Sequence, residues 1–545
     1  MSKNQLIALV CLATAFWSCS DSKDIQVIHD ARILQPNVPL VAGRDNPEAL
    51  EFSFTVAGET SSLELKSVEL FFAEAGSGGI LDAVTANLTT IAGDHTEESL
   101  FGETGTIASP LKLNGLLELG EGVHTLSFSF GVKEDAGLEQ IVQVEKVVLH
   151  FGKDKKLTVE ADKKHRYRLA KVIREAGQDN CDTYRIPGLV TTGNGTFVAV
   201  YDNRYNNSKD LQEDIDIGMS RSIDGGQNWE PMKVILDMGE WGGRSEQLNG
   251  IGDPCVLYDH HTHTIWVAAL WMSGSAPDQM LWWASKPGLN PEETGQFILT
   301  KSTDDGLTWS EPINITEQIK DPSWQLLLQG PGRGITLDDG TLVFPAQFKA
   351  DLGEKALDGG QYTSHSTIVY STDGGKNWQI GSGAKSNTTE AQVVQLTDGS
   401  LMLNMRDDRN RQDKGDSNGR AVAITNDLGK TWTVHPSSNS ALPESNCMAS
   451  IISADLDTEG QTKRVLFFSN PNHKNQRTNM TIKASLDEGL TWPEEFQLEL
   501  NEAAGYGYSC LTMVDEQTIG ILYEGVKELY FQKVPISALL GDLIK

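Results

Sequence analysis

The sequence predicts an all-β protein with two domains, and three observations lead to this prediction. An eight-residue motif, Ser-x-Asp-x-Gly-x-(Asn/Thr)-Trp, occurs four times, and a fifth copy begins with threonine. The 52 glycines and 12 tryptophans are typical of turn-rich β-proteins. The chain of 545 residues is also longer than the roughly 250 to 300 residues that one core supports outside repeating folds.

The first 19 residues are typical of an export signal. Lys3 precedes an apolar run over residues 6–17, which is too short to span a bilayer. Cys19 follows the small residue Ser18 and resembles the cleavage site of a bacterial lipoprotein, where it becomes the lipidated N-terminus. A plain secretory signal cut nearby is the alternative. Both interpretations predict export to the periplasm or the outer membrane, and the first adds a membrane anchor.

Residues 25–160 are predicted to form an N-terminal β-sandwich, of a kind that binds carbohydrate or packs on the next domain. Apolar residues alternate with polar ones in two segments, as in strands with one buried face. Several such strands, separated by glycine-rich or acidic turns, favour a sandwich. The basic, polar stretch over residues 153–168 is the predicted domain boundary. The alternating apolar residues are Leu50, Phe52, Phe54 and Val56, and Leu126, Phe128, Phe130 and Val132.

The second predicted domain covers residues 166–533 and contains all five copies of the motif. Residues 534–545 are predicted to form a C-terminal tail. In each copy Asp and Gly suit a tight hairpin turn, the hydroxyl can bond locally and the tryptophan is an apolar plug. The closing tryptophans are 80, 69, 54 and 60 residues apart, so loops of varied length join the strands. Binding and catalytic residues are concentrated on such loops. The copies cover residues 222–229, 302–309, 371–378, 425–432 and 485–492.

Composition and cysteine spacing exclude several functions. The net charge of −30 makes nucleic acid an unsuitable partner. Beyond Cys11 and Cys19, four cysteines remain without CxxC spacing, so neither zinc nor a redox pair is indicated, and we expect buried free thiols. The His-rich stretch over residues 259–263 lacks an HExxH context and is interpreted as a hairpin tip. We therefore expect neither a metal nor a cofactor.

The repeated motifs resemble the Asp-boxes of the sialidase (neuraminidase) superfamily, and residues 184–187, Tyr-Arg-Ile-Pro, look like its Phe/Tyr-Arg-Ile-Pro motif. The resemblance covers about residues 166–533. It implies a six-bladed β-propeller after the sandwich and a monomeric exo-sialidase, which removes terminal sialic acid from sialylated glycans without a cofactor. Asp-boxes also occur on non-catalytic propellers, so the functional prediction depends on other residues.

The resemblance implies that Arg185, Arg406 and Arg477 bind the carboxylate of the substrate. A guanidinium offers a rigid fork of donors to a carboxylate, and three of them can bind an anionic sugar even on an acidic protein. Taken alone, each arginine is by default interpreted as part of a surface salt bridge.

The same resemblance makes Tyr508 the nucleophile and Glu390 its partner. A phenol suits this reaction because the anomeric carbon of sialic acid bears a carboxylate, which would repel an anionic nucleophile. Without the resemblance, Tyr506 or Tyr508 is equally well explained as a buried aromatic residue with a solvated hydroxyl, and Glu390 as a solvated strand residue.

Residues 202–210 resemble the loop that supplies a sugar-binding arginine and the acid, which implies Arg204 and Asp210 for these roles. Asp214 is the alternative acid. Glu524 matches the residue that orients the first arginine, and Asp253 matches one that lines the pocket near a hydroxyl or amide of the sugar. Trp271, Trp282 and Trp283 suit either sugar stacking or packing.

Two other functions use the same residues. A trans-sialidase or an intramolecular trans-sialidase would share the catalytic set but transfer sialic acid to another hydroxyl. A non-catalytic sialic-acid lectin would keep the fold and lose the chemistry, and the presence of Tyr508, Glu390 and Asp210 disfavours it.

Overall fold

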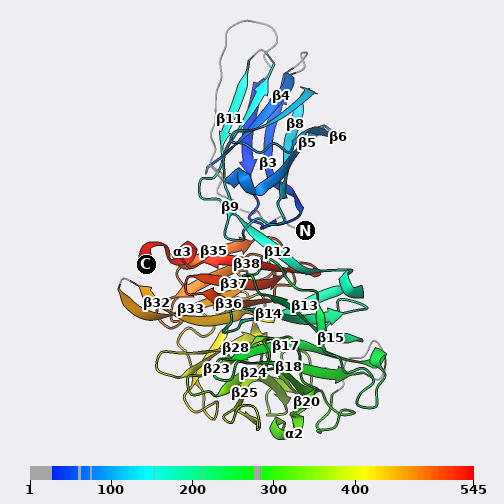
Figure 1. The fold of residues 1–545 in the computed structure, drawn as a ribbon, viewed down its shortest axis with the longest axis vertical. Coiled ribbons are helices and arrows are strands. Elements are labelled where there is room, and N and C mark those ends of the chain that lie inside the picture. The colour runs from blue at the N-terminus through cyan, green and yellow to red at the C-terminus, as the bar shows by residue number, and fades with distance from the viewer. Residues whose placement is uncertain are drawn as a thin grey trace. The chain divides into compact units, whose positions relative to one another are not determined.

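The computed structural model describes residues 27–58, 63–73, 77–152, 154–211, 213–274, 276, 283, 285–458 and 460–544. The chain divides into two compact units, Met1–Leu169 and Ala170–Lys545. Both consist of strands with a few short helices, which confirms the all-β prediction (Figure 1). The predicted signal with Cys19, and Trp282, lie outside the described residues. No helix within the described ranges is long and apolar enough to cross a membrane.

The first unit contains two antiparallel sheets, and the predicted alternation accounts for their buried faces. Phe52, Phe54, Phe128 and Phe130 are fully buried, while the residues between them are partly exposed. One sheet has the order β1 (Val27–Leu34), β3 (Asp45–Ala57), β8 (Gly122–Val132), β5 (Leu81–Ala92) and β6 (His95–Thr104). The other has the order β11 (Lys156–Glu160), β10 (Val144–Phe151), β4 (Leu63–Phe72) and β7 (Leu111–Leu119).

The described part of the second unit contains six sheets, each made chiefly of consecutive antiparallel strands. The first is β13 (Thr183–Thr191), β14 (Phe197–Arg204), β15 (Ile215–Ser222) and β16 (Lys233–Leu236). The second is β20 (Ile313–Asn314), β19 (Gln296–Ser302), β18 (Thr264–Ser273), β17 (Asn249–Asp259) and β22 (Gly332–Arg333). The third has β21 (Leu326–Gln329), β24 (Leu342–Ala350), β25 (Thr363–Ser371) and β26 (Gln379–Ile380), with β23 (Ile335–Thr336) and β27 (Lys385–Ser386) on its edges.

The remaining three sheets follow the same pattern, and the last is closed by a strand from the other end of the unit. The fourth is β28 (Thr388–Gln395), β29 (Leu401–Asp407), β30 (Ala421–Thr425) and β31 (Thr433–Val434). The fifth is β32 (Ser450–Thr458), β33 (Gln461–Pro471), β34 (Met480–Ser485) and β35 (Gln497–Asn501). In the sixth, β36 (Ser509–Asp515), β37 (Thr518–Glu524) and β38 (Glu528–Pro535) pair with β12 (Tyr167–Glu175). Pairing the two ends of the unit in one sheet ties its chain ends together.

The repeated motifs form turns of one kind, each directly after the third strand of a sheet. In the first copy, the Ser222 hydroxyl donates to Asp224 Oδ1 (2.9 Å) and accepts from the Gly226 amide (2.9 Å). Trp229 packs on Phe531, with ring centroids 5.3 Å apart. In the other four copies the glycine amide likewise donates to the hydroxyl oxygen of the serine or threonine. The motifs are therefore structural turns, as predicted, and the first of them lies at the opposite end of the β14–β15 pair from Arg204.

The four cysteines of the described chain, Cys181, Cys255, Cys447 and Cys510, are free and buried, as predicted. The His-rich stretch is the turn between β17 and β18, also as predicted. The described residues contain no group of three or more histidine, cysteine, aspartate or glutamate side chains that could hold a metal ion.

Candidate active site

Irregular strand pairing in three sheets of the second unit coincides with three of the candidate residues. The registers of β13, β17 and β28 shift between Arg185 and Gly188, between Gly252 and Cys255, and between Thr388 and Ala391. A bulge of this kind bends a strand and changes the direction of a side chain. The three shifts contain or adjoin Arg185, Asp253 and Glu390, so the candidate residues lie where the sheets depart from regular pairing.

Glu524, the last residue of β37, holds both Arg185 and the backbone beside Tyr508. Its carboxylate accepts from Arg185 Nε (3.0 Å) and Nη2 (3.2 Å) in the two-pronged geometry typical of a strong ion pair. It also accepts from the amides of Ile186 (2.8 Å) and Tyr508 (2.9 Å). Ile186 has a φ of 59°, which is costly for a β-branched residue, and the amide bond to Glu524 helps to hold it. One carboxylate therefore fixes two elements that are far apart in sequence.

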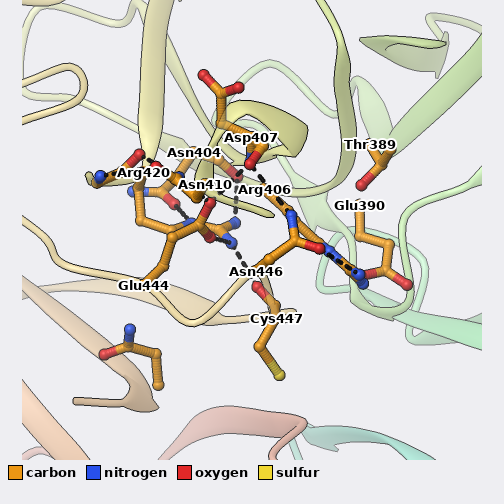
Figure 2. A network of polar contacts seen from close by, with 12 residues as sticks. Thr389, Glu390, Asn404, Arg406, Asp407, Asn410, Arg420, Glu444, Asn446 and Cys447 are labelled. Atoms are coloured by element: carbon orange, nitrogen blue, oxygen red, sulfur yellow. Dashed lines mark hydrogen bonds and ion pairs between the residues drawn. The ribbon is translucent and has the colours of Figure 1, made fainter. Parts of the chain in front are cut away.

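Tyr508, Glu390 and Arg406 form a connected triplet. The Tyr508 hydroxyl donates to Glu390 Oε1, and Arg406 Nη1 donates to Glu390 Oε2 (2.6 Å) and to the Tyr508 hydroxyl oxygen (3.2 Å). Figure 2 shows the Glu390 and Arg406 side chains approaching each other from β28 and β29. The triplet joins a neutral phenol, an acceptor and a cation.

Burial and charge set the protonation states of this triplet. Burial raises the pKa of Tyr508 well above its ordinary value and Glu390 adds to the increase, while Arg406 and Arg477 oppose it. Burial also acts to raise the pKa of Glu390, but Arg406 and the Tyr508 hydrogen bond outweigh it, so that the pKa is lowered. Glu390 is thus an ionised acceptor, and it is placed to receive the phenolic proton.

Arg477 and Arg185 lie over the ring of Tyr508. Their guanidinium carbons are 5.6 Å and 5.1 Å from the ring centroid. Arg477 Nη1 donates to the Tyr506 carbonyl oxygen (2.7 Å) and Nη2 to that of Asn446 (3.3 Å). Within the described ranges Arg477 forms no ion pair, so carbonyl groups orient it without cancelling its charge. Three arginines therefore surround one tyrosine, which favours an anionic ligand.

Asp210 bridges two arginines. Its Oδ1 accepts from Arg185 Nη1 (2.7 Å) and Arg204 Nη1 (2.7 Å), and 64% of its side chain is exposed. Partial desolvation acts to raise its pKa, but Arg204 and Arg185 outweigh this effect and lower the pKa to about 2. In this structure Asp210 is therefore an anion that occupies one donor of Arg185.

Asp202, which the sequence analysis missed, holds Arg204 and Asp253 in place. Arg204 is fully buried and donates from Nε (3.1 Å) and Nη2 (2.8 Å) to Asp202 Oδ2, while Oδ1 accepts from the Asp253 amide (2.8 Å). Burial, followed by Asp202, Asp210 and Glu390, raises the pKa of Asp253 well above its ordinary value. The environment therefore favours the protonated form of its carboxyl group, which can donate. Residues two apart on a strand share a face, which is the signal that could have identified Asp202 beside Arg204.

The other carboxylates and tryptophans that the sequence highlighted lie elsewhere. Trp271 is buried in packing: its ring centroid is 4.6 Å from that of Trp241, and its Nε1 donates to Asn249. Trp283 is 58% exposed, and its ring lies 5.0 Å from Lys349 Nζ. Burial, with Glu246 and Asp237, raises the pKa of Asp214 to about 6. Asp214 makes none of the arginine contacts that Asp210 makes.

Asp216 gives a prediction for the stability of the strand that follows the Asp210 loop. Burial, with Asp237 next, raises its pKa to about 7, and it accepts from the Tyr205 hydroxyl (2.8 Å). Between about pH 4 and 7 Asp216 is therefore more protonated in the folded than in the unfolded chain, so its contribution to the free energy of unfolding falls as the pH rises. Asp216→Asn should flatten this slope by up to about 1.4 kcal/mol per pH unit. Urea unfolding of both proteins at pH 5 and pH 7.5 gives the change in the free energy of unfolding between the two pH values. An equal change in both proteins would contradict this prediction.

The second unit combines five turns of one kind with a tyrosine, a carboxylate and three arginines in one site, and comparisons with known proteins identify the family. The model of the BNR repeat-like domain matches residues 195–521. A sialidase of Bacteroides fragilis is 48% identical over 84% of this chain and 80% of its own length. The structure of Hadza microbial sialidase Hz136 is 39% identical, with a TM-score of 0.82 over 93% of this chain and 99% of that one.

The chain therefore belongs to the family of bacterial sialidases with BNR repeats, and it is a glycoside hydrolase. The all-β architecture with many sheets is consistent with that of a sialidase β-propeller. The intramolecular trans-sialidase from Ruminococcus gnavus is 19% identical, with a TM-score of 0.52 over 67% of this chain and 97% of that one. This more distant likeness shows a shared fold.

Proposed function

We propose that the protein is an exo-α-sialidase, which hydrolyses terminal sialic acid from glycoconjugates with retention of configuration through Tyr508. The observation that carries this proposal is the hydrogen bond from Tyr508 to Glu390 beneath three arginines. Relatives named as sialidases support the same substrate class.

The proposal extends to the architecture and the location. The six sheets of the second unit are the blades of a six-bladed β-propeller, and the two sheets of the first unit form a β-sandwich. Residues 1–19 direct export, and Cys19 carries the lipid that anchors a monomeric protein in the periplasm or at the outer membrane. The partners are sialylated glycoproteins, glycolipids and oligosaccharides.

Substrate binding begins with an exchange of carboxylates. The substrate carboxylate binds Arg185, Arg406 and Arg477, and to do so it displaces Asp210 from Arg185 Nη1. Asp210 then loses one cation and gains an anion nearby, and both changes raise its pKa from about 2. With its pKa raised, Asp210 takes a proton from solvent and can then donate that proton to the leaving oxygen.

The chemistry then follows from the triplet. As the glycosidic bond breaks, Asp210 protonates the leaving oxygen, Tyr508 bonds to the anomeric carbon and Glu390 takes the phenolic proton. Asp210, now a carboxylate, takes a proton from water as that water attacks the anomeric carbon. The phenolate leaves and recovers its proton from Glu390. Two displacements at one carbon give net retention.

The alternative products are transferred or anhydro sialic acid, and NMR spectroscopy of a sialyllactose reaction distinguishes them. We expect α-sialic acid as the first product, which then converts to the β-anomer. A first product of β-configuration, a 2,7-anhydro product, or transfer to an added galactoside would each contradict hydrolysis with retention. Tight binding of sialyllactose without turnover would support a lectin and overturn the proposal.

A further inference from the structure

Asn446 touches two of the three arginines that surround Tyr508. It lies in the segment between β31 and β32, and it is buried. Its side-chain Oδ1 accepts from Arg406 Nη2 (3.0 Å), and its backbone carbonyl oxygen accepts from Arg477 Nη2 (3.3 Å). Figure 2 shows its amide group directed toward Arg406. A single residue therefore links arginines that are 71 positions apart in the sequence.

The neighbouring backbone fixes the orientation of the Asn446 amide. Its Nδ2 donates to the Asp407 carbonyl oxygen (3.1 Å) and to Asp408 Oδ1 (3.5 Å). A rotated amide would turn this donor toward the Arg406 guanidinium and lose all three bonds. The φ of Asn446 is 58°, a conformation that asparagine adopts more readily than most residues. Both the side chain and the backbone are therefore held in one arrangement.

A buried ion pair anchors the chain on both sides of Asn446. Arg420 Nη1 donates to Glu444 Oε2 (2.7 Å) and to the Cys447 carbonyl oxygen (2.7 Å). Glu444 Oε1 accepts from the Asp407 amide (2.9 Å). Arg420 and Glu444 are 0% and 1% exposed, and Figure 2 shows them beside the Arg406 segment. The pair thus ties residues 444–447 to the end of β29, where Arg406 lies.

The neutral charge of Asn446 matters for a site that takes an anion. Glu390 and Tyr508 occupy Arg406 Nη1, so the bond from Nη2 to Asn446 defines the plane of the guanidinium. A carboxylate here would orient the arginine equally well, but it would repel the carboxylate of a ligand. The Asn446 amide and carbonyl orient Arg406 and Arg477 without adding a second negative charge to that of Glu390.

We propose that Asn446 is a positioning residue, which sets Arg406 and Arg477 as one carboxylate-binding unit, with the Arg420–Glu444 pair as its support. This inference rests on the proposed function, because it assumes that the two arginines bind the carboxylate of a sialoside. Asn446 acts on the substrate only through the arginines.

Three variants test the proposal. Asn446→Gly removes the side chain but keeps the backbone carbonyl, and glycine accepts the φ of 58° without strain. Asn446→Asp keeps the acceptor and adds a negative charge. The control is Asn439→Gly, because Asn439 has a φ of 56° and bonds to Asp407 and Lys385 without a contact to Arg406 or Arg477. For each protein we would measure kcat and KM for a sialoside. We would also measure Ki for 2,3-unsaturated sialic acid and for its methyl ester.

Asn446→Gly should raise the Ki of the acid about tenfold, as expected for one lost bond to a charged group, and KM should rise more than kcat falls. The Ki of the methyl ester, which lacks the anion, should change by less than about twofold, because an ester gains little from a guanidinium pair. Asn446→Asp should weaken binding of the acid at least as much, and Asn439→Gly should resemble the wild type.

An unchanged Ki for the acid in Asn446→Gly, or an equal rise for acid and ester, would overturn the proposal. If Asn446→Gly does not fold, the ratio of acid to ester Ki in Asn446→Asp decides: a ratio equal to that of the wild type would overturn it. Failure of the proposed function is seen separately, because the wild-type protein would then not hydrolyse the sialoside at all.

Discussion

Replacing Tyr508 with phenylalanine should lower kcat/KM for an unactivated sialoside by roughly a thousandfold or more. The change removes one oxygen atom, which is the proposed nucleophile and the partner of Glu390 and Arg406. Glu524 still accepts from the backbone amide of residue 508, so the segment stays in place. Steady-state kinetics and the thermal unfolding midpoint of both proteins check this expectation.

Tyr506→Phe is the matched comparison for Tyr508→Phe. Tyr506 lies beside the same arginine, with its ring centroid 4.7 Å from Arg185 Cζ, but the acceptor for Arg477 is its backbone carbonyl, which the substitution keeps. The Tyr506 variant should lose far less activity than the Tyr508 variant. Near-normal turnover by Tyr508→Phe, or equal losses in the two variants, would contradict the assignment of the nucleophile.

Asp210→Asn should have the second large effect, and its size should depend on the leaving group. For sialyllactose, whose leaving oxygen needs a proton, kcat/KM should fall by roughly 10²-fold to 10⁴-fold. For an aryl sialoside the loss should be much smaller, because a phenolate leaves without a proton. Kinetics with both substrates measure the difference, and equal losses would show that Asp210 is not the acid.

The same variant also tests the carboxylate exchange. Asp210 occupies Arg185 Nη1 at 2.7 Å, so it competes with an incoming carboxylate. Since asparagine is neutral and binds a guanidinium more weakly, 2,3-unsaturated sialic acid should bind Asp210→Asn at least as tightly as the wild type. Isothermal titration gives both dissociation constants. Weaker binding by the variant would mean that Asp210 supports the ligand directly.

Local patterns predicted the parts of the fold that depend on neighbours in sequence. The motif that begins at Ser222 forms hydrogen bonds among its own residues, so its turn does not depend on the rest of the chain. The alternation around Phe52 and Phe128 likewise specifies one buried face in each strand. The residues placed around Tyr508 depended on the resemblance to a known family, and their roles stay predictions.

The supporting residues could not be predicted, because their partners are distant in sequence. Glu444 contacts Arg420 and Asp407, and Asn446 contacts Arg406 and Arg477, through a network that exists only after the fourth and fifth sheets have assembled. Trp271 illustrates the opposite problem, since composition alone could not distinguish a sugar platform from a packed ring. Single residues that bridge sheets leave no periodic signal.

The most direct test of the proposed chemistry is the trapping of a covalent intermediate on the enzyme. A 3-fluorosialosyl fluoride has a good leaving group and forms an intermediate that breaks down slowly. After incubation, intact-mass and peptide-mass measurements should find one fluorosialyl group per chain, attached to Tyr508, and none in Tyr508→Phe. A group attached to another residue, or an active enzyme that never forms the adduct, would contradict catalysis by a tyrosine nucleophile.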